Sequence, residues 1–152
     1  MSLESVRTFF AQHAPDIDVI VTEASSATVA LAAEAHGVEP DQIAKTICLR
    51  IGEDVVLVVT AGTRRLDNRK FKDRFGVKPR MLGAEEVVEI TSHPVGGVCP
   101  FGLPSPLKVF CDVSLKAFDT VVPAAGATNS AVRIAPERMA QLTHAEWADL
   151  CQ

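Results

Sequence analysis

The amino-acid sequence predicts a single α+β domain spanning residues 1–152, with a central, mostly antiparallel mixed sheet flanked by helices. Three observations predict this class. A chain of 152 residues is the size of one domain and can bury roughly two thirds of its unfolded surface. Helical and strand patterns alternate irregularly, and several strands are close enough to pair as hairpins. No repeat, low-complexity tract or linker divides the chain.

The first part of the chain contains two helical patterns separated by a short strand. Leu3, Val6, Phe9 and Phe10 recur at helical spacing, and Ser2 is placed to cap this first helix. The remaining elements predicted here are a β-branched strand at 17–21, a helix that Ser25 or Ser26 opens and Gly37 closes, and a helical turn at 41–44 that follows Pro40.

The middle of the chain predicts a β-hairpin followed by a basic helix. Strands at 46–51 and 55–60 are joined by three residues that include a glycine, which is typical of a hairpin. Asp67 is a favourable N-cap for a helix at 68–75, and Gly76 can end that helix.

The last third predicts short elements of both kinds. In order, they are a strand at 81–82, a helix at 84–90, a strand at 107–111, a helical turn at 114–118, strands at 120–122 and 130–134, a helix from Pro136, and a last helix opened by the capping-box pattern at 143–146.

The composition limits the classes of protein. No run approaches the ~20 apolar residues of a membrane span, and the first residues lack an apolar signal core, so a cytoplasmic location without a membrane partner is expected. The four cysteines form no C-x-x-C pair, and the four histidines show no metal-ligand spacing. Free thiols and no metal site are therefore expected.

The net charge is −4, but basic residues concentrate between positions 64 and 80. There, two acidic residues accompany eight basic ones: Arg64, Arg65, Arg69, Lys70, Lys72, Arg74, Lys78 and Arg80. A concentrated basic segment on an acidic protein indicates a phosphate-attracting surface, and a solvated helix face is the alternative.

The segment 91–104 is the most unusual in the chain. It contains three glycines and three prolines yet is apolar, whereas ordinary surface loops are rich in polar residues. Glycines let the backbone approach a ligand and prolines fix the neighbouring geometry, so such a loop can aim N–H groups at a carbonyl or oxyanion. A rigid apolar crossover packed into the core is the alternative.

Two further segments have the chemistry of a binding site. Lys45 stands where a helical turn meets an apolar strand, where it can hold a phosphate or ribose or simply face solvent. The segment 123–130 combines small residues with amide and hydroxyl groups, so it can wall a small pocket or form a tight turn between strands.

The sequence is also compatible with a thiol-dependent enzyme. Cys99 and His93 are close in sequence, and a Cys–His pair can activate a thiolate. No third, orienting residue is identifiable, and Cys99 between Val98 and Pro100 can equally be a small apolar filler.

Three segments together resemble the YbaK/ProX family of aminoacyl-tRNA deacylases, which is similar to the insertion domain of prolyl-tRNA synthetase. They are Lys45-Thr46, the loop 96–103 and the turn 125–130. The family's GxxxP signature is met by Gly96 and Pro100, and the similarity runs from about Ala27 to the helix after Pro136.

The resemblance implies hydrolysis of the ester between a wrong amino acid and the 3′ end of a tRNA, usually tRNA(Pro), with no metal or other cofactor. It implies that Lys45, Gly96 and Gly97 are catalytic, Lys45 engaging the terminal adenosine and the loop holding the aminoacyl carbonyl. The expected substrate-binding residues are Val98, Cys99, Pro100, Phe101, Thr128, Asn129 and Ser130. Those expected to bind tRNA are Arg64, Arg65, Arg69, Lys70, Lys72 and Arg74.

The sequence departs from the family pattern in two ways that leave the amino acid open. It contains no tyrosine, and the turn at 128–131 lacks the aspartate of some relatives. Alanine, cysteine, serine and threonine all stay plausible, because one methyl or hydroxyl supplies only about 1–3 kcal/mol of discrimination. The expected partner is the acceptor end of a mischarged tRNA, with prolyl-tRNA synthetase as a further candidate. A catalytically silent tRNA- or synthetase-binding module of the same fold is the alternative.

Overall fold

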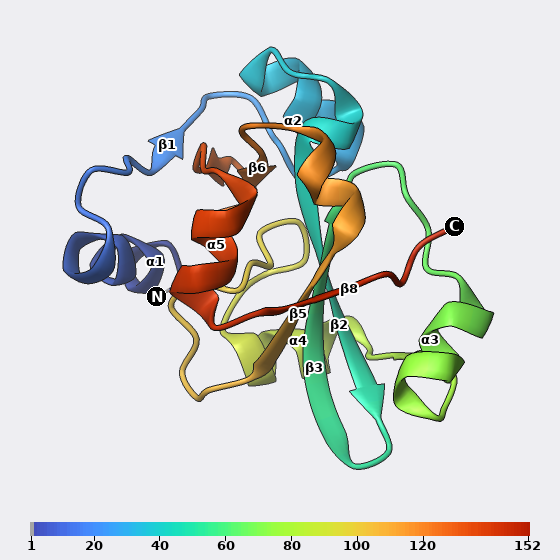
Figure 1. The fold of residues 1–152 in the computed structure, drawn as a ribbon. Helices are drawn as coiled ribbons and strands as arrows, with labels where there is room; N and C mark the ends of the chain where they lie inside the picture. Colours follow the sequence, from blue (N-terminus) through green and yellow to red (C-terminus); the bar gives the residue numbers. More distant parts are fainter. Residues whose placement is uncertain (1) are drawn as a thin grey trace.

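A long β-hairpin forms the centre of the fold. In the computed structural model, which describes residues 2–152, β2 (Ile43–Ile51) pairs antiparallel with β3 (Asp54–Ala61) (Figure 1). Their two-residue turn uses Gly52 at φ 60°, which glycine adopts without steric cost. β2 begins earlier than predicted, because the 3₁₀ turn η1 (Pro40–Gln42) is shorter than expected and the first residues of β2 pair with another strand.

The hairpin lies within a mixed six-stranded sheet. Its other strands are β4 (Arg80–Met81), β5 (Lys108–Asp112), β6 (Val122–Pro123) and β8 (Glu146–Ala148). The order is β4-β2-β3-β5-β8, and β6 pairs with the opposite end of β2 from β4. The longest ladder is antiparallel, while β3/β5, β5/β8 and β2/β6 are parallel. A separate pair joins β1 (Ile20–Val21) to β7 (Ser130–Ala131). The predicted α+β class is confirmed.

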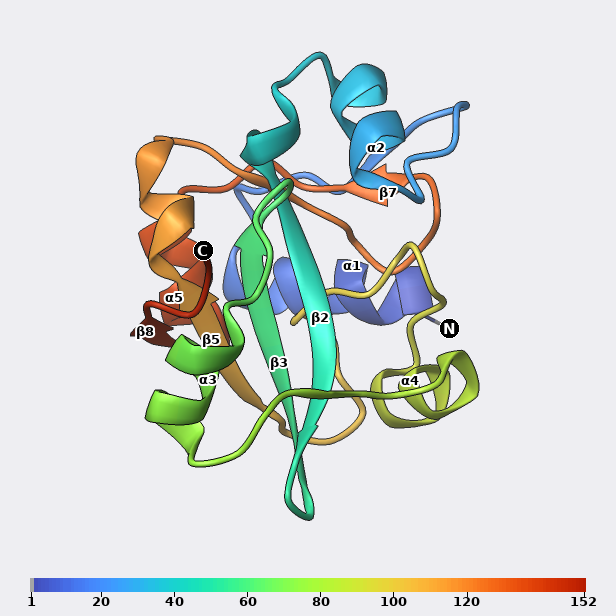
Figure 2. The ribbon, with the colours of Figure 1, turned by 90° about the vertical axis from the view of Figure 1, so that its right-hand side faces the viewer.

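Helices cover both faces of the sheet. They are α1 (Ser2–His13), α2 (Val29–His36), α3 (Asn68–Phe75), α4 (Ala84–Thr91) and α5 (Pro136–Thr143), with a 3₁₀ turn η2 (Val113–Ala117). α1, α4 and α5 pack on the face of β2 that carries Cys48, and α3 packs on the face that carries Leu49 (Figures 1 and 2). α2 packs at the end of the sheet against Ile43 and Val122.

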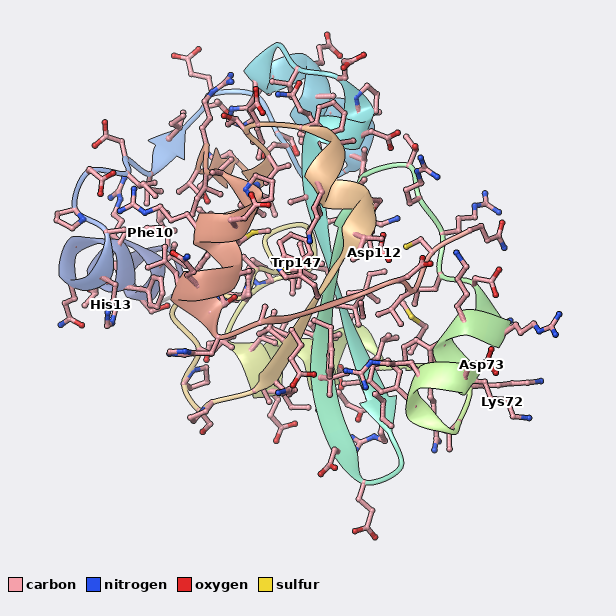
Figure 3. All side chains as sticks on the ribbon, viewed as in Figure 1. Phe10, His13, Lys72, Asp73, Asp112 and Trp147 are labelled. Carbon is pink, nitrogen blue, oxygen red and sulfur yellow. The ribbon has the colours of Figure 1, made fainter. Side chains whose placement is uncertain are left out.

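Helix α3 has the predicted bounds because its signals are local. Asp67 accepts hydrogen bonds from the N–H groups of Arg69 (2.9 Å) and Lys70 (3.0 Å), and Gly76 ends the helix at φ 79°. Phe71 is fully buried against the sheet, whereas Lys72 and Asp73 point to solvent (Figure 3).

Three sequence predictions about caps are wrong. The pattern at 143–146 opens no helix; Thr143 ends α5, and the following residues form β8 because they pair in parallel with β5. α2 is capped by Thr28 rather than by Ser25 or Ser26. Ser2 is itself helical, and its hydroxyl contacts Nδ1 of the buried His93.

Two predicted strands are shorter in the structure. The strands predicted at 17–21 and 130–134 are reduced to the two-residue β1 and β7.

One buried carboxylate holds the end of the chain against the sheet. Asp112, at the end of β5, is 1% exposed and accepts hydrogen bonds from the N–H groups of Leu150 (2.7 Å) and Cys151 (3.1 Å) (Figure 3). Its second oxygen accepts the N–H of Ser114 (2.9 Å) at the start of η2. Asp112 therefore fixes two chain segments at once.

Candidate functional site

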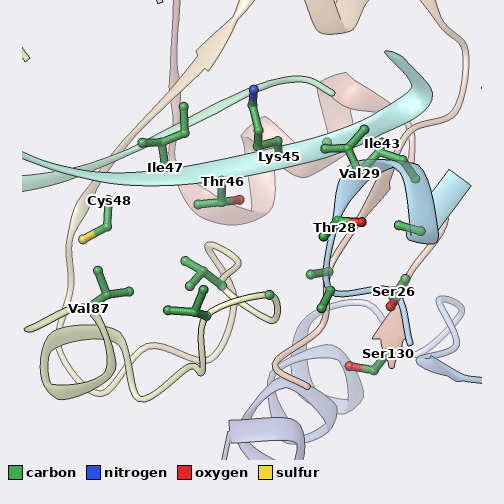
Figure 4. A pocket seen from close by; sticks show the side chains of 18 of the residues that line it. Ser26, Thr28, Val29, Ile43, Lys45, Thr46, Ile47, Cys48, Val87 and Ser130 are labelled. Carbon is green, nitrogen blue, oxygen red and sulfur yellow. The ribbon is translucent and has the colours of Figure 1, made fainter. Parts of the chain in front are cut away.

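A cavity of about 470 Å³ lies beside β2. Its walls are residues 43–48 of β2, parts of the segments 26–32, 81–87 and 122–131, and Val95, Gly96 and Val98 of the glycine-rich loop (Figure 4). Most of the lining is aliphatic, and Lys45 is its one charged residue within the described chain. A concave, mostly apolar site with a few polar groups is typical of small-ligand binding.

The cavity meets β2 at the edge of the strand. Alternate side chains of a strand point to opposite faces, yet six consecutive residues, 43–48, line the cavity. On this edge β6 pairs with Ile43 and Ala44, and β4 pairs with Leu49 and Arg50. Among residues 2–152, no strand pairs with the stretch 45–48 there, so this gap presents unpaired backbone groups to the cavity.

The glycine-rich loop is clamped against two neighbouring segments. A Cβ on Gly96, whose φ is 90°, would stand 2.8 Å from Cβ of Ala27, and one on Gly97 would stand 2.8 Å from the backbone N of Ala127. The N–H of Gly97 donates to the carbonyl of Pro94 (2.8 Å), and its carbonyl accepts the N–H of Gly126 (3.0 Å). Only glycines allow this close packing.

This clamp leaves specific donors at the cavity. Gly96 and Val98 line it, and across residues 2–152 their N–H groups have no protein acceptor. Gly97 does not line the cavity, and its N–H is already used. The loop can therefore direct the N–H groups of Gly96 and Val98, rather than that of Gly97, at a bound carbonyl.

The side chain of Lys45 lies on the other face of the strand. Lys45 and Ile47 extend away from the side that carries Thr46 and Cys48 (Figure 4). The Lys45 ammonium donates to the carbonyl of Arg64 (2.8 Å), and burial lowers the pKa of Lys45 from its usual value. Lys45 thus borders the cavity with its backbone, while its charge lies beside the basic segment.

Several predicted substrate-binding residues lie outside the cavity lining. Cys99 and Phe101 are fully buried, and Phe101 packs on the rings of Phe9 and Phe10. Pro100 is buried and does not line the cavity. Asn129 is half-buried and does not line it either, and its side-chain amide donates to the carbonyl of Thr22 (2.9 Å). Thr128 is exposed, and its carbonyl accepts bonds from Ser26. The predicted residues that the cavity does bring together are Lys45, Gly96, Val98 and Ser130.

The geometry around Cys99 disfavours a thiolate. Burial raises the pKa of the Cys99 thiol to about 12, so it is neutral near pH 7. His93 Nε2 lies 3.5 Å from Cys99 Sγ and 2.8 Å from the carbonyl oxygen of Phe101. His93 is also fully buried, and burial lowers its pKa. This pair is a packing and hydrogen-bonding unit under the loop.

Helix α3, in the middle of the basic segment 64–80, packs on the face of β2 that carries Leu49, opposite the lining side chains of Thr46 and Cys48. Three cations of the segment bind the end of the chain: Lys70 pairs with Asp149 (3.0 Å), Arg74 with Glu146 (2.9 Å), and Arg64 donates to the carbonyl of Gln152 (3.1 Å). Within the described chain, the exposed Arg65, Arg69 and Lys72 form no ion pair.

Thr46 lines the cavity, and although it belongs to the Lys45-Thr46 motif, the sequence assigned it no role of its own. Its hydroxyl has no accessible surface and no hydrogen-bond partner among residues 2–152. The apolar run around it gave no signal, because an unpartnered hydroxyl can be identified only once its neighbours are placed.

Within residues 2–152, no group of three His, Cys, Asp or Glu residues could hold a metal ion, and no helix is long and apolar enough to cross a membrane.

The fold and the cavity define a small α+β protein with a ligand-sized site at a gap in the sheet edge. The sequence pattern described as the aminoacyl-tRNA editing domain matches residues 23–142, and the chain belongs to this family. The predicted resemblance is therefore confirmed.

Relatives of the chain include proteins with and without an assigned activity. It is 47% identical over 154 residues to YwhH of Bacillus subtilis (strain 168), an uncharacterised protein, covering 100% of this chain and 98% of YwhH. It is 26% identical over 121 residues to EbsC of Enterococcus faecalis (strain ATCC 700802 / V583), a candidate Cys-tRNA(Pro)/Cys-tRNA(Cys) deacylase, covering 78% and 73%. A crystal structure of a candidate trans-editing enzyme for prolyl tRNA synthetase matches with TM-score 0.92 and 31% identity, covering 99% and 97%.

Proposed function

We propose that the protein is a trans-editing deacylase that hydrolyses the ester of a mischarged aminoacyl-tRNA, with tRNA(Pro) as the favoured tRNA. The observation that carries this is the meeting, in one cavity, of the unpaired stretch 45–48 of β2 with Gly96 and Val98, two loop residues whose N–H groups have no protein acceptor within residues 2–152. Membership of the editing-domain family supports the reaction class, and the likeness to EbsC and to the trans-editing structure supports the tRNA.

The chemistry needs little from side chains. An aminoacyl ester is already activated, so holding it beside a water and stabilising the developing oxyanion can suffice. In this proposal the N–H groups of Gly96 and Val98 donate to the oxyanion, and Gly97 positions them through its bonds to Pro94 and Gly126. Loss of one such donor typically lowers kcat about 10²- to 10³-fold.

The tRNA end would cross the edge of β2. The aminoacyl group would occupy the cavity, and the terminal nucleotide would reach the face where Lys45 lies beside the basic segment. Lys45 would then hold a phosphate or ribose as a point charge, and the unpaired Arg65, Arg69 and Lys72 would contact phosphates further along. Prolyl-tRNA synthetase is the candidate partner that would supply the mischarged tRNA.

The test is a deacylation screen. tRNA(Pro) charged separately with alanine, cysteine, serine, threonine or proline is incubated with the protein, with Lys45→Ala and with Lys108→Ala, a lysine on β5 outside the cavity. Release of a non-cognate amino acid that Lys45→Ala slows and Lys108→Ala does not is the expected result. Binding of tRNA without release of any amino acid would instead identify a silent binding module.

A binding experiment tests the basic segment separately. Neutralising Arg65, Arg69 and Lys72 together should weaken tRNA binding and reduce the slope of log K against log salt by up to about 3. Unchanged affinity and slope would remove these three residues from the interface.

A further inference from the structure

Four hydroxyl side chains line the cavity, and three are already engaged within the protein. Ser26 Oγ donates to the carbonyl of Thr128 (3.2 Å), Thr28 Oγ1 accepts the N–H of Leu31 (3.2 Å), and Ser130 Oγ accepts the N–H of Ala127 (3.0 Å). Thr46 Oγ1 has no partner within residues 2–152. Of the four, Thr46 alone forms no hydrogen bond at all within these residues, so both its donor and its acceptor capacity are left for a ligand.

An unpartnered hydroxyl lowers the stability of the folded protein, because its bonds to water are lost on burial and not replaced. Valine has nearly the same shape as threonine and would remove this loss. Thr46 Oγ1 also breaks no protein hydrogen bond when it turns about χ1 toward the cavity that Thr46 lines. The position therefore suits a hydroxyl that gains its partner only when the cavity is occupied.

The surroundings of Thr46 determine which substrate group it can meet. Within the described residues, no acidic side chain lines the cavity. A single neutral hydroxyl cannot replace the water around an α-ammonium group, so that charge stays at the open side. The group that reaches Thr46 is then neutral. A hydroxyl can both donate to and accept from Thr46, whereas a thiol bonds weakly and a methyl not at all.

We infer that Thr46 is a specificity residue that selects an acyl group bearing a hydroxyl, namely serine or threonine, over alanine and cysteine. The inference rests on the proposed function for the identity of the ligand as an aminoacyl-adenosine end. A small substrate hydroxyl satisfies Thr46, and an alanyl group leaves it unsatisfied. Sites that hydrogen-bond a substrate hydroxyl discriminate against analogues that lack it.

Thr46→Val and its matched control, Thr28→Val, test the inference. The three quantities measured are Tm, kcat/KM and the Kd of non-hydrolysable analogues. Thr46→Val should raise Tm, because it removes an unpartnered buried hydroxyl, whereas Thr28→Val should lower Tm, because it removes the cap of α2. Thr46→Val should also lower kcat/KM for seryl-tRNA(Pro) about 10- to 100-fold and change that for alanyl-tRNA(Pro) less than about threefold.

Binding separates recognition from hydrolysis. The 3′-amide analogues of seryl- and alanyl-adenosine cannot be deacylated, so their Kd values report recognition even if the protein hydrolyses nothing. Wild type should prefer the seryl amide about tenfold or more, and Thr46→Val should lose that preference. Equal affinity of wild type for the two amides, or an equal loss of both in the variant, overturns the inference. Hydrolysis without a preference for the seryl group would support the proposed deacylase function but refute the specificity role of Thr46.

Discussion

The contact of Gly97 with the turn at Ala127 offers the sharpest test of how the loop is held. A Cβ at position 97 would lie 2.8 Å from the backbone N of Ala127 and 3.0 Å from its C and O atoms. Real Cβ atoms do not approach backbone so closely, so loop and turn must separate. Gly97 does not have a left-handed φ, so the cost of Gly97→Ala is steric alone.

Overpacking of this kind costs about 1–3 kcal/mol in unfolding free energy. For a chain of this size each kcal/mol shifts Tm by about 2–4 °C, so Gly97→Ala should lower Tm by about 2–12 °C. Separation would also displace the neighbouring N–H groups of Gly96 and Val98. Any deacylation should therefore fall at temperatures where the variant is still folded.

The assay is thermal unfolding followed by circular dichroism, beside Gly83→Ala. Gly83 has an ordinary φ of −69°, and a Cβ there would meet only Glu86 Oε1 at 4.0 Å. As an N-cap it should lose less than about 1 kcal/mol on replacement by alanine. If Gly97→Ala is no less stable than Gly83→Ala, the loop is not clamped as described.

Three other outcomes are expected. Asp112→Ala should cost about 3–5 kcal/mol in urea unfolding, because it leaves the N–H groups of Leu150, Cys151 and Ser114 without their acceptor. Stability should fall as pH drops below about 6.5, because burial lowers the pKa of His93 and of His36 and the unfolded chain then binds more protons. Cys99→Ala should retain any deacylation at temperatures where it is folded, because the thiol is fully buried and is not part of the cavity lining.

Each of these has a contrary result. If the urea unfolding of Asp112→Ala has the same midpoint and slope as that of wild type, the Asp112 carboxylate does not stabilise the end of the chain. A His93→Gln, His36→Gln double variant should lose much of the pH dependence between pH 5 and 7, and an unaltered profile would assign it to other groups. Loss of turnover in a folded Cys99→Ala protein would revive the thiol mechanism.

The sequence predicted best what depends on neighbouring residues. The bounds of α3 follow from Asp67 and Gly76, and the central hairpin follows from its β-branched runs and Gly52. The pattern at 143–146 misled because a capping box is also compatible with other local structure, and the pairing of Glu146 with Phe110 decided the outcome. That pairing joins positions far apart in the chain.

The site was harder to predict than the fold for a related reason. The glycine-rich loop and the turn at 130 were identified by composition, but composition does not say which backbone donors stay unpaired. The sequence predicted Lys45 at the site. Because successive side chains of a strand point to opposite faces, its ammonium lies on the face opposite Thr46. Likewise, half of the predicted tRNA-binding cations bind the chain's own end.

The gap in the edge of β2 bears on how readily another chain could pair with the sheet there. Unpaired strand edges are templates for the addition of another chain, and most proteins must protect them. Here the opening spans only 45–48, with β4 and β6 occupying the edge on either side. A typical strand of about five to six residues is too long to enter it. The edge can therefore stay open to a small molecule without offering a full-length strand a place to pair.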